Sequence, residues 1–140
     1  ATNYNKYILG YTIFLDITAR IMQKNDREIN LPWYRSKNFD TFGPIGPEIV
    51  ADIKDPHELK IELKINGKIK QSSNTKHMIF KIPKIIEYIS NHLTLEPGDI
   101  IATGTPEGVG SIHPGDLIEA SIEKIGTLRN MVILEETKDP

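Results

Sequence analysis

One stretch of strict alternation near the middle of the chain constrains the fold more than any other feature of the 140-residue sequence. Over Leu59–Asn66, apolar residues at every second position alternate with charged or amide residues. This period of two is typical of a strand that buries one face and exposes the other. Asn66-Gly67 follows, and both residue types tolerate the positive φ angles of a two-residue hairpin turn. The sequence therefore predicts an antiparallel hairpin with its return strand over Lys68–Ser72.

The rest of the chain carries short apolar runs separated by turns rich in glycine and proline. Further strands are predicted over Tyr7–Phe14, Glu48–Ala51, Asp99–Thr103, Leu117–Glu123 and Thr127–Glu135. The tail Glu136–Pro140 is predicted to be frayed. One main helix is predicted over about 82–93, because Pro83 suits a first helical turn and isoleucines recur at a spacing of three and four. Thr18–Gln23 is predicted to form one or two helical turns, with Thr18 as a candidate cap, and Asn25–Asn30 a polar loop. This pattern favours an α+β, β-rich fold, with residues 1–140 as a single domain.

Composition excludes several kinds of chemistry. The chain has no cysteine, which excludes disulfides, thiolate nucleophiles and cysteine-bound zinc and agrees with a cytoplasmic location, or a mitochondrial one in a eukaryote. A formal net charge of -2 with dispersed lysines gives no reason to expect nucleic-acid binding. No stretch approaches the roughly 18 apolar residues of a membrane span, so no membrane partner is expected. The sequence starts without methionine and soon reaches a predicted strand, so we expect the C-terminal portion of a longer protein.

A carboxylate, a guanidinium and an amide lie within eight residues, just after the first predicted strand. Asp16 follows an apolar run, where an unpaired carboxylate is costly, so it is either a ligand for Mg²⁺, Mn²⁺ or Ca²⁺ or a helix cap. Arg20 either clamps a substrate carboxylate or forms a structural salt bridge. Gln23 lies on the same helical face and is either a further substrate contact or plainly exposed to solvent.

A second polar group lies in an aromatic-rich stretch, Leu31–Phe42. Lys37 is either held near a site as a substrate clamp or electrophile, or it packs its stem on the rings and leaves its amine in water. Asp40 is a candidate for orienting Lys37, and the hydroxyl of Thr41 is a candidate contact for substrate or a metal-bound water. Both interpretations of Lys37 stay open on the residues alone.

A third candidate is the loop Thr103–Gly110, which contains three glycines and one proline. Glycines such as Gly104 let backbone N–H groups approach an anion, and Thr105 adds a hydroxyl. A tight turn without a ligand explains the spacing equally well. The four histidines lack a second histidine at metal-ligand spacing, so structural roles are predicted for them.

These motifs occur in one order across nearly the whole chain. They occupy Leu15–Gln23, Leu31–Phe42, Gly46-Pro47, Asn66-Gly67, Met78–Phe80, Leu95–Asp99 and Thr103–Gly110. Their joint pattern resembles the fumarylacetoacetate hydrolase family. The resemblance implies a mixed β-sheet roll, a homodimer, and a Mg²⁺ or Mn²⁺ site, with Ca²⁺ as a further option. It also implies a small-molecule 2-oxo acid substrate, bound through a metal-stabilised enolate.

The resemblance implies one of three reactions, and it does not separate them. Members of the family hydrolyse acylpyruvates, decarboxylate oxaloacetate-like acids, or isomerise and decarboxylate 2-hydroxy-diene-dioates. Asp16 resembles a carboxylate ligand of the metal, and Arg20 and Gln23 resemble substrate-contacting positions. One departure lies between them, because Ile21 stands where the family usually has a second acid, and its loss removes a partner that would steady Arg20.

Four further positions carry over from the family. Lys37 and Thr41 resemble the lysine and threonine of the catalytic site, with the amine near substrate and metal. Thr105, preceded by Gly104, resembles the loop hydroxyl that holds the substrate carboxylate. The resemblance therefore implies catalytic roles for the first pair and substrate-binding roles for the second.

A complete metal site is not expected from this chain alone. The family's Glu-x-Glu ligand pair and its lid His and Glu are expected upstream of Ala1, and Glu62 is predicted to point outward from its strand. One carboxylate holds Mg²⁺ poorly, so this chain by itself is predicted to be inactive, whereas a longer parent is predicted to be an enzyme. The alternative is a non-catalytic relative or binding module that kept the fold and lost the metal.

Overall fold

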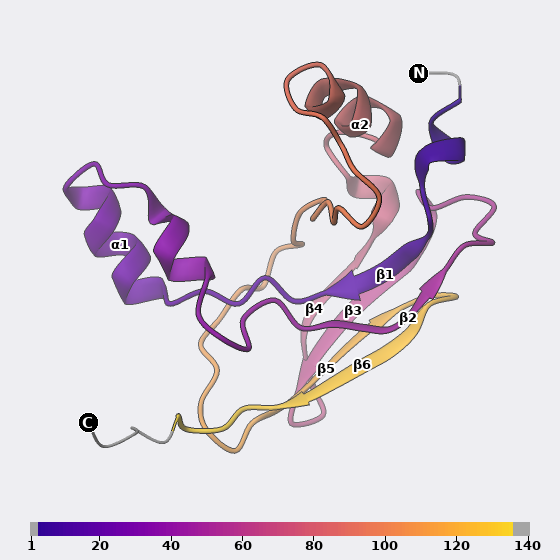
Figure 1. Ribbon diagram of the computed structural model, residues 1–140. Coiled ribbons are helices and arrows are strands. Elements are labelled where there is room, and N and C mark those ends of the chain that lie inside the picture. Colours follow the sequence, from indigo (N-terminus) through magenta and orange to yellow (C-terminus); the bar gives the residue numbers. More distant parts are fainter. Residues whose placement is uncertain (1–2, 136–140) are drawn as a thin grey trace.

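The computed structural model describes residues 3–135 and contains two β-sheets (Figure 1). The larger sheet has the order β4-β3-β5-β6, formed by Lys68–Asn74, Lys60–Ile65, Leu117–Ile122 and Gly126–Met131. The smaller sheet pairs β1 (Tyr11–Phe14) with β2 (Ile45–Val50). The β-rich α+β fold class is thereby confirmed. Every pairing among the described strands is antiparallel, so within residues 3–135 the sheets are not mixed.

The central hairpin is the one that the alternation predicts. β3 and β4 pair up to the turn, where Ile65 lies opposite Lys68. The turn residues have φ angles of 51° at Asn66 and 76° at Gly67, both in the left-handed region that a type I′ turn requires. β3 also pairs with β5, so the predicted alternating strand lies inside the sheet.

The core lies where the two sheets meet. Its buried members are Ile13, Leu15, Ile53, Leu59, Ile118, Ala120 and Ile125. Ile13 comes from β1, whereas Ile118 and Ala120 are two residues apart and therefore share one face of β5. This apolar contact fixes the end of β1 against the larger sheet, and the candidate site begins at that end.

Two nine-residue helices project from the sheets at separate places (Figure 1). α1 (Arg20–Glu28) and the short 3-10 helix η2 (Trp33–Lys37) follow β1, whereas α2 (Ile82–Ser90) follows β4 and the 3-10 turn η3 (Thr75–His77). The helix predicted over about 82–93 is α2, which ends at Ser90. α1 is a second helix that the sequence predicts only as one or two turns, and it includes most of the predicted polar loop at 25–30.

Some predicted strands differ from the structure. The strand predicted over Tyr7–Phe14 begins only at Tyr11. Tyr7, where the predicted strand starts, is instead the last residue of the 3-10 helix η1 (Tyr4–Tyr7). The strand predicted over 99–103 is irregular, because no described strand pairs with this segment. The last strand ends at Met131 rather than at 135, and the polar tail predicted to fray, residues 136–140, lies outside the described residues.

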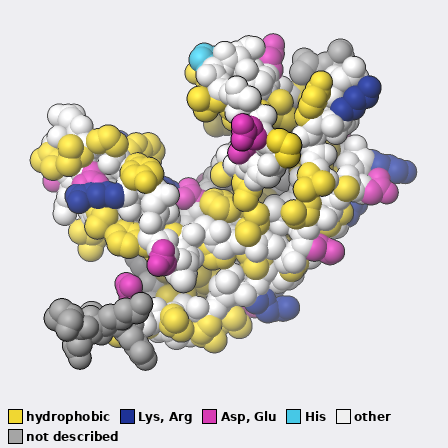
Figure 2. Space-filling model, in the orientation of Figure 1, with side chains coloured by type: hydrophobic (Ala, Val, Ile, Leu, Met, Phe, Trp, Pro, Cys, Tyr) yellow, Lys and Arg dark blue, Asp and Glu magenta, His cyan; other side chains and the backbone are white. Residues whose placement is uncertain are grey.

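The surface is hollowed between the α1 region and the α2 region, and hydrophobic side chains gather on both (Figure 2). Large exposed apolar residues in these regions include Ile21, Ile29, Trp33 and Tyr34 on the first and Ile79, Phe80, Tyr88 and Leu93 on the second. Within the described part of the chain, neither helix is long and apolar enough to cross a membrane.

Candidate active site

The site begins where β1 ends. Leu15 is buried in the core, and its N–H donates to the carbonyl of Pro44 at 3.0 Å. The next residue, Asp16, leaves the core, and its side chain is 44% exposed. Leu15 therefore fixes the backbone on which the carboxylate of Asp16 stands. The carboxylate accepts no helix N–H among the described residues, so the capping interpretation of Asp16 is wrong.

Lys37 lies 21 residues along the chain from Asp16, yet its ammonium group meets the Asp16 carboxylate directly. Lys37 Nζ donates to both carboxylate oxygens at 2.7 Å and to Thr18 Oγ1 at 2.8 Å. The Lys37 side chain is 27% exposed, but its ammonium is held by these three hydrogen bonds, so the interpretation that leaves the amine free in water is wrong. Asp16, and not the predicted Asp40, orients this lysine. Thr18 is the partner that sequence reasoning missed, since it was expected as a cap, and the N-cap of α1 is Ala19.

A buried ion pair holds α1 against η2. Asp26 is fully buried in the second half of α1, and Arg35 Nε donates to its two carboxylate oxygens at 3.1 and 2.9 Å. These hydrogen bonds hold the pKa of Asp26 below its ordinary value. The N–H of Ala19 also donates to the carbonyl of the buried Ser36 at 2.9 Å. Since Ser36 precedes Lys37, this frame sets where the lysine stands.

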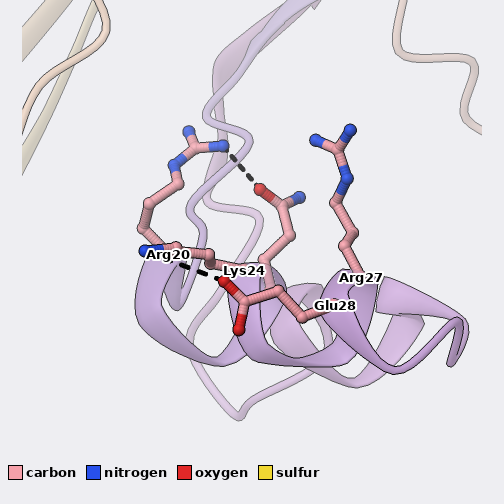
Figure 3. A pocket seen from close by; sticks show the side chains of 5 residues that line it. Arg20, Lys24, Arg27 and Glu28 are labelled. Atoms are coloured by element: carbon pink, nitrogen blue, oxygen red, sulfur yellow. Dashed lines mark hydrogen bonds and ion pairs between the residues drawn. The ribbon is translucent and has the colours of Figure 1, made fainter.

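Arg20 and Gln23 meet on one face of α1. Arg20 Nη1 donates to Gln23 Oε1 at 2.7 Å, and the Gln23 residue is only 4% exposed. The interpretation of Gln23 as plainly solvent-exposed is therefore wrong, and no acidic partner of Arg20 exists among residues 3–135. Both residues line a shallow open cavity of about 320 Å³ that also involves Lys24, Arg27 and Glu28 (Figure 3).

The remaining predicted residues lie on exposed backbone. Thr41 has a φ of 67°, and Thr105 follows Gly104, whose φ is 116°. The loop that carries Thr105 is anchored on β4, because Gln71 Nε2 donates to the carbonyl of Pro106 at 3.2 Å. No hydrogen bond within the described residues joins Thr41 or this loop to Asp16. Their predicted roles toward substrate stay predictions.

The described residues supply one suitable metal ligand and not a complete site. Asp16 offers carboxylate oxygens, the ligand type that Mg²⁺ and Mn²⁺ prefer. Nowhere in residues 3–135 do three or more His, Cys, Asp or Glu side chains gather as a metal site. Glu62 does not add to Asp16, because its carboxylate pairs with Lys60 and Lys64 at 3.2 Å each. With a side chain only 15% exposed, Glu62 is also more covered than its predicted outward position implies.

One histidine has a clear structural task. His57 Nε2 accepts a hydrogen bond from the N–H of Ile82 at 3.2 Å, and Ile82 is the first residue of α2. A ring nitrogen thus satisfies one of the free N–H groups at the start of that helix. His57 is therefore engaged in holding α2, as the prediction of structural histidines requires.

Comparison with known proteins relates this chain to enzymes. A protein of Pyrococcus abyssi is 60% identical over 132 residues, covering 94% of this chain and 59% of that protein. The mitochondrial oxaloacetate tautomerase of Mus musculus is 44% identical over 124 residues, covering 88% of this chain and 56% of that protein. The chain thus spans between a half and three fifths of the length of these relatives.

Solved structures agree with this relation. The 2-hydroxyhepta-2,4-diene-1,7-dioate isomerase of Mycobacterium marinum matches with a TM-score of 0.88 and 47% identity, over 94% of this chain and 50% of that one. The fumarylpyruvate hydrolase of Pseudomonas aeruginosa, solved with Mn²⁺ and pyruvate, matches with a TM-score of 0.88 and 35% identity, over 94% and 57%. The model of the fumarylacetoacetate hydrolase C-terminal domain matches residues 1–133. This chain therefore belongs to the fumarylacetoacetate hydrolase family.

Proposed function

We propose that this chain is the C-terminal portion of the catalytic domain of a metal-dependent enzyme that acts on 2-oxo or 2-hydroxy-dienoic acids. The observation that carries the proposal is the contact of Lys37 Nζ with both oxygens of Asp16. It unites the two segments in which the family resemblance places a metal ligand and a catalytic lysine. The Mn²⁺ and pyruvate in the fumarylpyruvate hydrolase structure support both the metal and the substrate class.

We assign three residues of this chain to the reacting centre. Asp16 would hold Mg²⁺ or Mn²⁺, with Ca²⁺ as a further option, together with ligands from outside the described residues. Such a metal polarises a 2-oxo group and favours the enolate. Lys37 places a positive charge beside the same point, where negative charge develops on substrate oxygen. Thr41 is proposed as a hydroxyl contact of the reacting group.

Substrate binding is assigned to two other parts of the chain. Arg20 and Gln23 are proposed to contact the substrate from α1, because both line the cavity on that helix. Gly104 and Thr105 are proposed to hold a substrate carboxylate from the loop anchored on β4. A substrate bound between them would need the hollow that lies beside the α1 region (Figure 2).

The reaction is proposed at the level of its class. The named relatives act on oxaloacetate, 2-hydroxyhepta-2,4-diene-1,7-dioate and fumarylpyruvate, which all carry two carboxylate groups. Hydrolysis, decarboxylation and isomerisation each require an enolate next to a 2-oxo acid, so the same Asp16 and Lys37 serve all three. We propose a homodimer as the working form, following the resemblance.

The proposal is tested by calorimetry on the full-length natural protein, titrated with Mn²⁺ and then with oxalate as an enolate mimic. Asp16→Asn should weaken Mn²⁺ binding by at least about 10-fold, because it removes a charged ligand. Asp52→Asn is the matched control, since Asp52 is exposed and follows Val50, which pairs with Tyr11 at the end of β1 opposite Asp16. Equal Mn²⁺ affinity in wild type and Asp16→Asn, or no Mn²⁺ binding at all, would favour the non-catalytic alternative.

A companion variant separates chemistry from metal binding. Lys37→Met should lower kcat by about 100-fold if the ammonium stabilises developing charge. The same variant should not weaken Mn²⁺ binding, because it frees both oxygens of Asp16. An unchanged kcat would reduce Lys37 to a packing residue.

A further inference from the structure

The ammonium group of Lys37 is held by two different residues. Lys37 Nζ donates to the two oxygens of Asp16, each at 2.7 Å, and to Thr18 Oγ1 at 2.8 Å. An ammonium group has three N–H donors and no lone pair, so these three acceptors satisfy it completely and the Thr18 hydroxyl must accept. Both partners belong to the short segment between β1 and α1.

The single proton of the Thr18 hydroxyl is used in another direction. Thr18 Oγ1 donates to the backbone carbonyl of Asp16 at 3.4 Å. With its proton on that carbonyl, the hydroxyl oxygen presents its lone pairs to Lys37. The hydroxyl of Thr18 is therefore oriented as an acceptor for the ammonium group.

The backbone on both sides of Thr18 is fixed. The N–H of Ile17 donates to the carbonyl of Leu15 at 3.0 Å. The N–H of Ala19 donates to the carbonyl of Ser36 at 2.9 Å, and Leu15 and Ser36 are both buried. Threonine is also branched at Cβ, which restricts its χ1 angle. Packing therefore sets the position of the hydroxyl, whatever the long lysine side chain does.

The two partners of Lys37 differ in how they respond to a metal ion. The carboxylate of Asp16 would have to serve a divalent cation and the ammonium group at once, and these two positive groups repel each other. Thr18 is uncharged, and in residues 3–135 it is the one hydrogen-bond partner of Lys37 outside that carboxylate. Donors of Lys37 that leave Asp16 are then available to a substrate oxygen, while Thr18 keeps the third.

We propose that Thr18 is a positioning residue, which holds the ammonium of Lys37 beside the developing enolate oxygen while Asp16 is engaged by the metal ion. This inference rests on the proposed function and deepens it, because it adds a residue to which the family resemblance gives no role. Thr18 acts through Lys37, and no contact between Thr18 and substrate is needed.

The test is a double-mutant cycle on the Mn²⁺-loaded, full-length protein, with calorimetric titration of oxalate as the enolate mimic. Thr18→Val keeps the shape of the side chain and removes the hydroxyl. We expect it to weaken oxalate binding by about 10-fold, because one hydrogen bond to a charged group is lost. Lys37→Met should weaken oxalate binding at least as much, because it removes the ammonium itself.

The decisive comparison is between the two backgrounds. In the Lys37→Met protein, Thr18→Val should change oxalate affinity by no more than about twofold, since the group through which Thr18 acts is gone. Thr18→Ser restores the hydroxyl and should recover affinity to within about threefold of wild type. Mn²⁺ affinity should stay within about twofold in every Thr18 variant, because Thr18 contacts no carboxylate oxygen.

A control and a kinetic measurement complete the design. Thr12→Val also removes a hydroxyl that donates to a backbone carbonyl, that of Gly46 at 3.2 Å, and should leave oxalate binding unchanged. Thr18→Ala takes the place of Thr18→Val if valine prevents folding. With oxaloacetate or fumarylpyruvate, whichever wild type turns over, Thr18→Val should lower kcat by about 10-fold and leave KM within about twofold. The binding cycle decides alone if neither is turned over.

Each outcome bears on a different claim. A loss of oxalate affinity that requires Lys37 and is recovered by serine supports the positioning role. An equal loss in the Lys37→Met background overturns it, as does an unchanged affinity in Thr18→Val or no recovery in Thr18→Ser, and all three leave the proposed function intact. Unchanged oxalate affinity in Lys37→Met overturns the role of the lysine together with that of Thr18. Failure of wild type to bind oxalate overturns the proposed function as well.

Discussion

Gly108 should tolerate no side chain, because it fixes the proposed substrate loop against β4. A Cβ at this position would lie 2.1 Å from the carbonyl oxygen of Lys70, whereas real Cβ contacts stay beyond 3.0 Å. The loop would have to retreat by about 0.9 Å, the difference between these two distances. Such overpacking costs about 1–3 kcal/mol, and the φ of +96° adds about 1–2 kcal/mol of left-handed strain. We therefore expect Gly108→Ala to lower the free energy of unfolding by about 2–5 kcal/mol.

The same loop supplies graded controls. Gly104 has a φ of +116° with no atom near its would-be Cβ, so Gly104→Ala should cost only the strain, about 1–2 kcal/mol. Gly110 has neither a positive φ nor a close neighbour, so Gly110→Ala should be neutral or slightly stabilising. Chemical denaturation of the full-length protein measures all three. A Gly108→Ala variant as stable as Gly110→Ala would refute the docking of the loop on Lys70, whatever its effect on activity.

Two further predictions concern side chains that hold the frame of the site. The pKa of Asp26 is lowered by its hydrogen bonds with Arg35, so its contribution to stability is complete above its ordinary pKa near 4 and is lost as the pH falls through the lower folded value. Asp26→Asn should therefore flatten the decline of stability on acidification, measured by denaturation between about pH 2 and 6, and an unchanged pH profile would contradict the pairing. His57→Ala should cost about 1 kcal/mol, because it removes the acceptor for the N–H of Ile82. Hydrogen exchange should then quicken in the first turn of α2 and not in β3.

The parts of the fold that the sequence predicts well are those with local causes. The alternation over 59–66 and the Asn66-Gly67 turn need no distant partner, and both appear in the structure as expected. The segment 99–103 has strand-like residues but no described strand beside it, so pattern alone misleads there. α1 is longer than predicted because the buried Asp26 finds Arg35 nine residues away, and no helix pattern records that contact.

In the candidate site, too, the contacts that depend on distant parts of the chain are the ones that the sequence does not predict. The family resemblance selects Asp16 and Lys37 as site residues, but their direct contact joins positions 21 residues apart and depends on how η2 folds back. The burial of Gln23 likewise depends on the tertiary packing around α1. The polar sequence around Gln23 does not reveal that packing, so the sequence alone suggests an exposed residue. Thr18 looked like a cap and serves instead as a partner of Lys37. A threonine two residues after a predicted carboxylate ligand is the sequence signal that points to this role.

The two charged residues of the proposed metal site, Asp16 and Lys37, each follow a buried anchor. Leu15 lies in the core and its N–H is bonded to the carbonyl of Pro44, and Asp16 follows it. Ser36 is fully buried and its carbonyl accepts from the N–H of Ala19, and Lys37 follows it. The ammonium and the carboxylate are partly exposed, and an exposed ion pair alone contributes little to holding two long side chains in one geometry. The adjacent anchors therefore set the geometry. The contact between Lys37 and Asp16 is a consequence of this packing, because the ion pair alone could not hold the two side chains in place.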